Sequence, residues 1–550
     1  MARPWRYLVM AVVAAVGLST ASCAAGPTDA EGLTADGLVP FINLGDYAPG
    51  AQPQRNFNPF SPNKAVVGYT FETLYQVDGF NCGETPWLAT EYAWEGTQKL
   101  TFTLRDGVKW HDGKPFTADD VVFTYEMIKQ YPALDTMGVG PALTSITATG
   151  NQVTMEFAKP AVLLFSKVAK VEIVPKHIWA NAGDPVRFTN TDAVGTGPYK
   201  VKTFNARQMV LERDPNYWQA DKVKVQELRF THSPEGQVDQ LRLERGEYDM
   251  NSMFVPEIDE VYVSKDPEHN KYWFAPGGVI SLYPNLTKAP FDDVAFRRAL
   301  VPAFDRQGIA DKAQFGYVET ASQTGLILPN QEEWLDPDIE NAGHVETDVD
   351  AAKSALDDAG YTVDGEGRRL GKDGQPLSFE FKVPAGWNDW IQAAQIIRSD
   401  FDKLGIQVDV TTPQQATYEQ DRGVGNYDLL FGVYGGDCNI HKDFADPLAS
   451  AQSADVGKVA VSNFSRWRDP ETDGLLDDLQ VAGDEETQRA AVHELQRVMM
   501  EDVPNIPLWY GAKWFQYRTA RVSGWPSAED PYAVSTDVLL IITRLQPAGS

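Results

Sequence analysis

Residues 104–123 read LRDGVKWHDGKPFTADDVVF and contain a change from strand to helix. An Asp-Gly pair at 106–107 predicts a hairpin-type turn. Thr117, with Asp120 three residues later, has the spacing of a helix capping box. The apolar residues change from a period of two before the turn to one helical face after it: Leu100, Phe102 and Leu104, then Val121, Tyr125 and Ile128. The stretch therefore predicts a hairpin joined to a capped helix.

The C-terminal half repeats an order of helix, glycine and strand. Residues 350–359 form one amphipathic pattern that Gly360 ends, and residues 389–404 form another that Gly405 ends. Alternating apolar residues follow the second pattern at 406, 408 and 410. Without the short period of a solenoid or propeller, this order predicts an α/β protein with added antiparallel strands.

Composition limits the class of protein. The chain has 550 residues, enough for two to four folded units. Lys and Arg total 48 against 77 for Asp and Glu, a net charge of −29. Because nucleic-acid binding depends on cations that neutralise phosphates, a nucleic-acid partner is not expected. The chain has 3 cysteines, none paired at C-x-x-C spacing, which argues against zinc ribbons and iron–sulfur clusters.

The first residues predict export. Residues 1–22 combine Arg3 and Arg6 with an apolar run too short for a comfortable membrane span, as in a signal peptide. The small residues before Cys23 resemble a lipobox, although Thr20 stands where leucine is usual. We expect Cys23 to carry a lipid and residues 23–35 to tether the protein to the outer face of the cytoplasmic membrane. The alternative is an ordinary secretory signal with a chance cysteine.

Signals for catalysis are weak. The 7 histidines are far apart in sequence, so a helical metal-binding pair is not predicted. Nucleophile-elbow and dinucleotide-binding fingerprints do not occur. The stretch 367–372 has the wrong spacing for a phosphate loop and is interpreted as a hairpin turn. We therefore predict neither catalytic residues, nor a resident metal, nor a cofactor, and the chain is not expected to be an enzyme.

Three segments carry a resemblance to a known family. They are residues 104–123; VGTGPYKV at 194–201 with LERDPNYW at 211–218; and FDDVAFRRAL at 291–300 with AFDR at 303–306. In this order they resemble the family 5 extracytoplasmic solute-binding proteins, the peptide- and nickel-binding receptors of ABC importers. The segments look structural: Gly195 and Gly197 suggest positive φ or close backbone approach, and His111 a hydrogen-bonded turn residue.

The resemblance implies a two-lobed, type II periplasmic-binding-protein-like α/β fold with an extra strand-rich subdomain in the first lobe. The first lobe would comprise residues 36–70, 190–284 and 515–550, the extra subdomain 71–189 and the second lobe 285–514. The resemblance further implies a monomer that closes on a ligand between its lobes. An ABC permease would recognise the closed form, and ATPase subunits would supply the energy.

The stretch LLFGVYGGDCN at 429–439 indicates where a ligand would bind. In peptide-binding relatives an aspartate after this strand resembles the anchor for the peptide's α-ammonium group, and Asp437 holds that position; the alternative is a water-exposed turn aspartate. Tyr434, Gly436 and Asn439 are candidate neighbours. Trp387 and Trp390 lie where cleft loops occur in the family, either as a binding wall or as core packing.

Peptides are the leading ligand expectation because they are the commonest in the family. An oligosaccharide is the runner-up, since aromatic walls also suit sugar rings. A nickel chelate, or a sensor role for peptides or cell-wall fragments, completes the alternatives.

Two cysteines remain after Cys23. Cys82 and Cys438 would face an oxidising compartment, which favours a disulfide. In relatives both neighbourhoods lie near the cleft but in different lobes, so the bond would restrict opening. Two buried thiols are the alternative.

Overall fold

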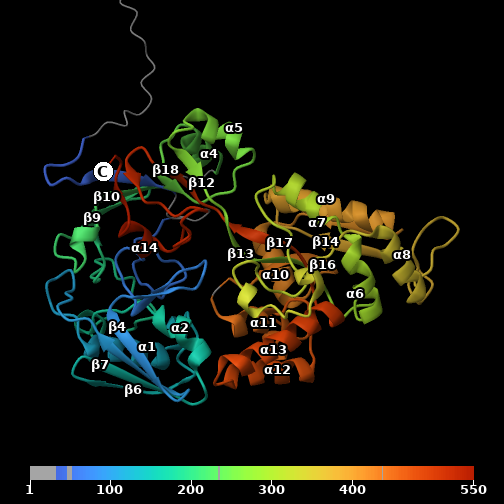
Figure 1. Cartoon of the computed structure of the whole chain (residues 1–550), viewed down its shortest axis with the longest axis horizontal. Helices are drawn as coiled ribbons and strands as arrows, with labels where there is room; N and C mark the ends of the chain where they lie inside the picture. The colour runs from blue at the N-terminus through green and yellow to red at the C-terminus, as the bar shows by residue number, and fades with distance from the viewer. Residues whose placement is uncertain (1–31, 46–52, 233–235, 437, 550) are drawn as a thin grey trace, which may run out of the picture.

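The computed structural model describes residues 32–45, 53–232, 236–436 and 438–549. It has two α/β lobes beside each other, and a third, strand-rich unit lies below the first lobe in the view of Figure 1. The predicted signal peptide and Cys23 lie outside the described residues.

The first lobe is built on a seven-stranded sheet of order β12-β18-β11-β1-β10-β9-β8. The central strand β1 is parallel to β10 and β11, and the outer pairs are antiparallel. The strands of this lobe are β1 (Val39–Leu44), β8 (Tyr199–Phe204), β9 (Gln208–Arg213), β10 (Val225–Thr231), β11 (Met250–Asn251), β12 (Asn270–Tyr272), β18 (Gln516–Arg518) and the pair β19 (Val522–Ser523) and β20 (Gln546–Pro547). Its helices are α4 (Gly236–Glu244), α5 (Ile258–Val261) and α14 (Val538–Ile542).

The extra subdomain is a four-stranded antiparallel sheet of order β4-β5-β7-β6. Its elements are β2 (Tyr75–Val77), β3 (Glu84–Pro86), β4 (Ala89–Glu95), β5 (Lys99–Leu104), α1 (Ala118–Gln130), β6 (Leu143–Thr149), β7 (Gln152–Phe157), α2 (Phe165–Ala169) and α3 (Lys176–Trp179). One continuous apolar cluster joins this sheet to the first lobe, so we expect the two to behave as a single body.

The stretch that predicted the fold forms β5, a turn and α1. The backbone N–H of Thr117 donates to Asp120 Oδ2 at 2.9 Å, one half of the predicted capping box. His111 Nε2 lies 2.8 Å from the carbonyl oxygen of Gly197, and its Nδ1 accepts from the Gly195 N–H, so this histidine connects the turn to the first lobe. Burial lowers the pKa of His111 to about 4.

Gly195 and Gly197 are required for close approach rather than for positive φ. A Cβ on Gly195 would lie 1.8 Å from the carbonyl oxygen of Thr70, and one on Gly197 would lie 2.6 Å from that of Tyr69. These distances leave no room for a side chain.

The second lobe has a five-stranded sheet of order β15-β14-β16-β13-β17. Its strands are β13 (Ala275–Pro284), β14 (Ser378–Lys382), β15 (Gln407–Thr411), β16 (Leu429–Tyr434) and β17 (Ile506–Lys513). Its helices are α6 (Val294–Leu300), α7 (Arg306–Gly308), α8 (Val349–Asp358), α9 (Asn388–Lys403), α10 (Gln415–Val424), α11 (Ile440–Leu448), α12 (Pro470–Val481) and α13 (Glu485–Arg497). Separate apolar clusters form its core.

Two segments connect the lobes. The chain passes from β12 to β13 through residues 273–274, and it returns from β17 to β18 through residues 514–515. The second crossing follows β17, which ends at Lys513. The first does not coincide with the predicted boundary at 284, because all of β13 pairs within the second lobe's sheet. A strand's sequence does not indicate which sheet it joins, and the residues of β13 therefore contain no sign of this crossing.

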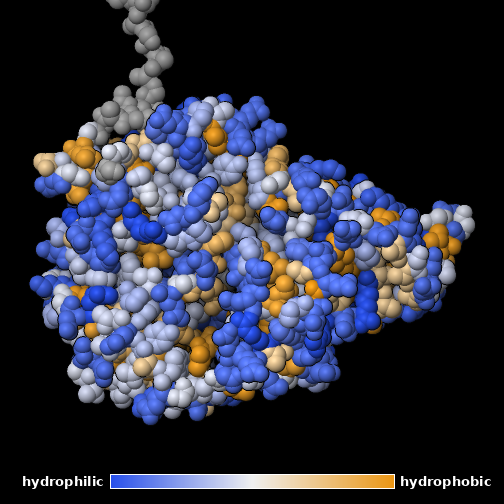
Figure 2. Space-filling model, viewed as in Figure 1, coloured by the Kyte–Doolittle hydropathy of each residue, from blue (hydrophilic) through white to orange (hydrophobic). Residues whose placement is uncertain are grey.

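The surface in the view of Figure 2 is mostly hydrophilic, and hydrophobic residues gather along the junction between the lobes. Among the described helices, none has both the length and the apolar content needed to cross a bilayer.

Candidate functional site

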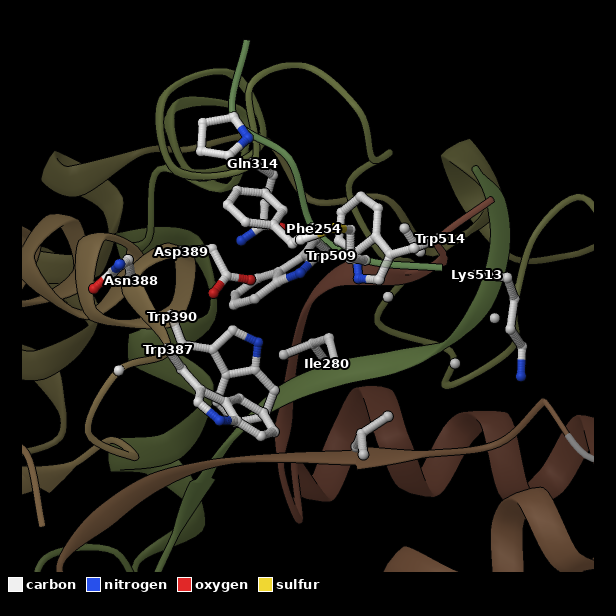
Figure 3. Close-up of a pocket in the computed structure, with 18 of the residues that line it drawn as sticks. Phe254, Ile280, Gln314, Trp387, Asn388, Asp389, Trp390, Trp509, Lys513 and Trp514 are labelled. Atoms are coloured by element: carbon white, nitrogen blue, oxygen red, sulfur yellow. The ribbon is translucent and has the colours of Figure 1, made fainter. Parts of the chain in front are cut away.

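A cleft of about 780 Å³ lies where β13 and β17 run between the lobes (Figure 3). Met253, Phe254 and Pro256 line it from the first lobe, and residues 386–390 and Gln314 line it from the second. Its floor is formed by residues of β13 and β17, including Gly278, Ile280, Trp509 and Gly511. Segments from four distant parts of the chain thus meet at the crossing strands.

The second lobe presents an indole to the cleft. Trp387 precedes α9 and keeps 42% of its surface exposed. The ring of Trp390 supports it edge to face at 4.6 Å between centroids. Behind Trp390, Phe431 and Trp509 continue the aromatic packing into the core. This packing fixes the Trp387 ring at the cleft surface.

The opposite side of the cleft is also aromatic. Phe254 and Trp514 pack edge to face at 5.3 Å, and Phe274 supports Trp514 at 4.8 Å. Figure 3 shows Phe254 and Trp514 on one side of Ile280 and the Trp387–Trp390 pair on another. Tyr317, from the second lobe, completes the group, and its hydroxyl accepts from the backbone N–H of Ile258 in the first lobe at 2.8 Å. The two lobes therefore touch at one end of the cleft.

Polar groups in the cleft are few. Asp389, Gln314, Gln240, Asn388 and Lys513 are among them. Burial raises the pKa of the Asp389 carboxyl, while the backbone N–H of Trp390 and the amide of Gln314 act in the opposite direction. A cleft that combines aromatic rings with several polar groups is typical of a small-molecule binding site.

The predicted site residues separate into two groups. Trp387 and Trp390 line the cleft. Tyr434 does not: its side chain is 4% exposed and packs in the core of the second lobe. Strand side chains alternate between faces, so its neighbour Val433 faces the cleft instead and is 50% exposed.

Gly436 and Asn439 occupy positions that the fold itself requires. A Cβ on Gly436, which has φ +87°, would lie 2.2 Å from the carbonyl oxygen of Gly277 at the edge of the cleft. Asn439 caps α11 by accepting from the Lys442 N–H at 2.9 Å, and its Nδ2 donates to the Leu163 carbonyl at 2.6 Å. Asp437 lies outside the described residues, so its predicted contact with an ammonium group stays a prediction.

Cys82 and Cys438 are joined by a disulfide across 356 residues of sequence. Cys82 belongs to the loop after β2 in the extra subdomain, and Cys438 lies between β16 and α11 of the second lobe. The bond therefore connects the two bodies beside the crossing strands.

Within the described residues, no cluster of three or more His, Cys, Asp or Glu side chains could hold a metal ion. The arrangement in the cleft suits reversible binding of a ligand against aromatic rings.

A family model described as "Bacterial extracellular solute-binding proteins, family 5 Middle" matches residues 84–455. The chain belongs to this family. It is therefore a substrate-binding protein of the kind that serves ABC importers outside the cytoplasm, and not an enzyme.

The relatives of this solute-binding protein include peptide receptors. It is 25% identical to Di/tripeptide-binding protein 1 of Pseudomonas aeruginosa over 485 residues, which cover 82% of this chain and 86% of that one. It is 24% identical to the dipeptide-binding protein of Escherichia coli over 478 residues, covering 80% and 85%. Similarity thus extends over most of each chain.

Solved structures have the same two-lobed fold. A periplasmic oligopeptide-binding protein from Thermotoga maritima matches with a TM-score of 0.84 and 27% identity, over 92% of this chain and 99% of that one. The same protein bound to mannohexaose matches with a TM-score of 0.77 and 28% identity, covering 93% and 99%.

Sequence reasoning did not identify the other lining residues of this solute-binding protein. Phe254, Gln314, Trp509 and Trp514 occur singly, outside the three family segments. The only available signal was the high number of tryptophans, 14 in all, and it does not indicate which of them share a surface.

Proposed function

We propose that this substrate-binding protein captures an oligosaccharide between its lobes and delivers it to an ABC permease. The observation that carries the proposal is the aromatic lining on both sides of the cleft. A sugar ring presents a face of C–H groups that packs on an indole, and its edge presents hydroxyl groups. Trp387 supplies one exposed ring, and the Phe254–Trp514 pair supplies a second contact. Two separated aromatic contacts favour a ligand of two or more rings.

The similarity to a protein solved with mannohexaose supports the same ligand class. Acidic or metal-binding clusters are not needed to bind a neutral sugar, and the cleft's polar side chains, the charged Asp389 and Lys513 included, can all form hydrogen bonds with hydroxyl groups. We therefore place the oligosaccharide, which was second among the sequence-based expectations, ahead of the peptide.

Peptides are the second candidate. The curated relatives are named as di- and tripeptide-binding proteins, and Asp437 follows β16 where the family resemblance puts an ammonium anchor. A nickel chelate and a sensor role stay as predictions from the sequence.

Native mass spectrometry of protein purified without denaturant separates the candidates. Added masses spaced by hexose units, released on unfolding, are the expected result. Titration calorimetry with mannohexaose and with a nonapeptide then measures each affinity. Binding of the nonapeptide without binding of mannohexaose would contradict the proposal and favour a peptide receptor.

We also propose that Cys23 is lipidated after removal of residues 1–22 and holds a monomer at the outer face of the cytoplasmic membrane. Metabolic labelling with a palmitate analogue should mark the wild type and leave Cys23→Ser unlabelled and released. Equal labelling of the wild type and Cys23→Ser would show that Cys23 does not carry the lipid.

A further inference from the structure

Two polar side chains meet at one side of the cleft. Asp389 is the second residue of α9, and Gln314 directly follows the π-helical turn η6 (Ile309–Ala313). The helix α9 packs against this turn, so the two side chains come from adjacent elements. Figure 3 shows both beside Trp509 at the inner end of the cleft.

Gln314 is unusual among the residues that line the cleft. Its side chain is 1% exposed, yet it lines the cleft. Its Nε2 atom has no hydrogen-bond partner within the described residues, although the amide lies near enough to stabilise the Asp389 carboxylate. A buried N–H donor left without an acceptor destabilises the protein, so a ligand that accepts from it would recover that free energy.

Asp389 complements this donor with an acceptor. Within the described part of the chain no Lys or Arg side chain forms an ion pair with it. A carboxylate has about four lone-pair positions, more than the neighbouring groups occupy. The pair thus offers one donor and several acceptor positions side by side, next to the aromatic wall of Trp387 and Trp390.

We infer that Asp389 and Gln314 together recognise two adjacent hydroxyl groups of an uncharged sugar ring and select against acidic sugars. One hydroxyl donates to the Asp389 carboxylate, and the oxygen of its neighbour accepts from Gln314 Nε2. A sugar carboxylate in the same position would lie against the Asp389 carboxylate, and two like charges at that distance repel each other. The inference rests on the proposed oligosaccharide function.

Ligand choice tests the selection against charge. Titration calorimetry on the wild type should give at least tenfold weaker binding for hexamannuronate, an oligosaccharide of similar size that carries a carboxylate on each ring, than for mannohexaose. In Asp389→Asn this difference should shrink to less than threefold, because the asparagine keeps the shape and removes the charge. Equal affinity of the wild type for both sugars would overturn the inference.

Variants test the two contacts themselves. We expect Asp389→Asn and Gln314→Leu each to weaken mannohexaose binding at least tenfold. The double variant should weaken it by a smaller factor than the product of the two single factors. Asp402→Asn, the same substitution at an exposed position near the far end of α9 and outside the residues that line the cleft, is the matched control and should bind within twofold of the wild type. Melting temperatures near that of the wild type show that the variants are folded.

The outcomes distinguish this inference from the proposed function. If mannohexaose binds the wild type and both variants equally, the oligosaccharide function stands and the roles of Asp389 and Gln314 are wrong. If the wild type binds the nonapeptide and no sugar, the proposed function is wrong and this inference with it.

Discussion

Cys82 and Cys438 form a disulfide between the extra subdomain and the second lobe. The Cys82 loop is itself fixed to the first lobe, because the Gly79 N–H donates to Asp537 Oδ2 at 2.8 Å. Asn330 of the second lobe donates to the Phe80 carbonyl of the same loop at 3.0 Å. The lobes are thus joined by two chain crossings and one covalent cross-link, and Phe80 of the Cys82 loop packs on Trp273 of the first crossing. Such a link limits how far the lobes separate.

Removing the disulfide should widen the open state and lower stability. For Cys82→Ser/Cys438→Ser we expect an increased radius of gyration without ligand in small-angle X-ray scattering. The free energy of unfolding should fall by roughly 2–4 kcal/mol, because the unfolded chain loses a long closed loop.

A reducing agent provides the control for this prediction. It should shift the wild type towards the double variant and leave the double variant unchanged. Superimposable scattering curves for oxidised wild type and double variant would show that the bond does not limit opening.

Glu72 predicts a pH dependence of stability. Its carboxylate is fully buried and accepts from the indole of Trp87 and the hydroxyl of Tyr217 at 2.5 and 2.7 Å. Burial raises its pKa from 4.5 to about 7. Between these values the folded protein keeps a proton that the unfolded chain has released, so unfolding becomes easier as pH rises. The stabilisation is complete below pH 4.5 and lost by about pH 7, a change of roughly 3 kcal/mol.

Comparison with Glu72→Gln isolates this contribution. His111, whose pKa is lowered to about 4, gives the opposite slope between that value and 6.5 in both proteins. Urea unfolding from pH 4.5 to 7 should show the wild type losing stability relative to Glu72→Gln. The matched control is Glu126→Gln, at an exposed position on α1. Its free energy of unfolding should change with pH as that of the wild type does. If the free energies of unfolding of the wild type and Glu72→Gln differ by the same amount at every pH in this range, the assigned pKa of Glu72 is wrong.

Much of the local structure could be predicted from the sequence. Alternation at Leu100, Phe102 and Leu104 gave β5, and the Thr117–Asp120 spacing gave the start of α1. These signals depend on a few neighbouring residues, as does the end of α9 before Gly405. The sheet to which β13 belongs depends on pairing with residues more than 140 positions away, and nothing in its own sequence specifies that.

The cleft was partly predictable, because some of its lining residues are close to one another in sequence. Trp387 and Trp390 stand out because they are close in sequence. Tyr434 and Val433 are neighbours on β16 and point to opposite faces, so Tyr434 packs in the core of the second lobe while Val433 lines the cleft. Gln314 and Trp514 reach the cleft only through tertiary packing, so a single sequence contains no sign of their proximity.

The variant Gly195→Ala tests how closely the segment 194–201 approaches the backbone of Thr70 in the first lobe. Gly195→Ala places a methyl group against the carbonyl oxygen of Thr70, so we expect a loss of roughly 3 kcal/mol or a failure to fold. Gly474→Ala, inside α12 with open space around it, is the control and should stabilise by about 0.5–1 kcal/mol. Thermal unfolding of both variants measures the contrast. A Gly195→Ala protein as stable as the wild type would show that the backbone at Thr70 can move away.

Trp387 should contribute binding free energy with little effect on folding. Because its ring is 42% exposed, Trp387→Ala removes little core packing, and the melting temperature should change by only a few degrees. Loss of the stacking surface should weaken mannohexaose binding by about 2 kcal/mol, roughly thirtyfold. Trp94→Ala, on β4 of the extra subdomain and away from the cleft, is the matched tryptophan control and should leave the affinity unchanged. Trp387→Phe should recover part of the loss, since a smaller ring still offers a flat face. If Trp387→Ala binds mannohexaose as tightly as Trp94→Ala does, the exposed indole is not part of the binding surface.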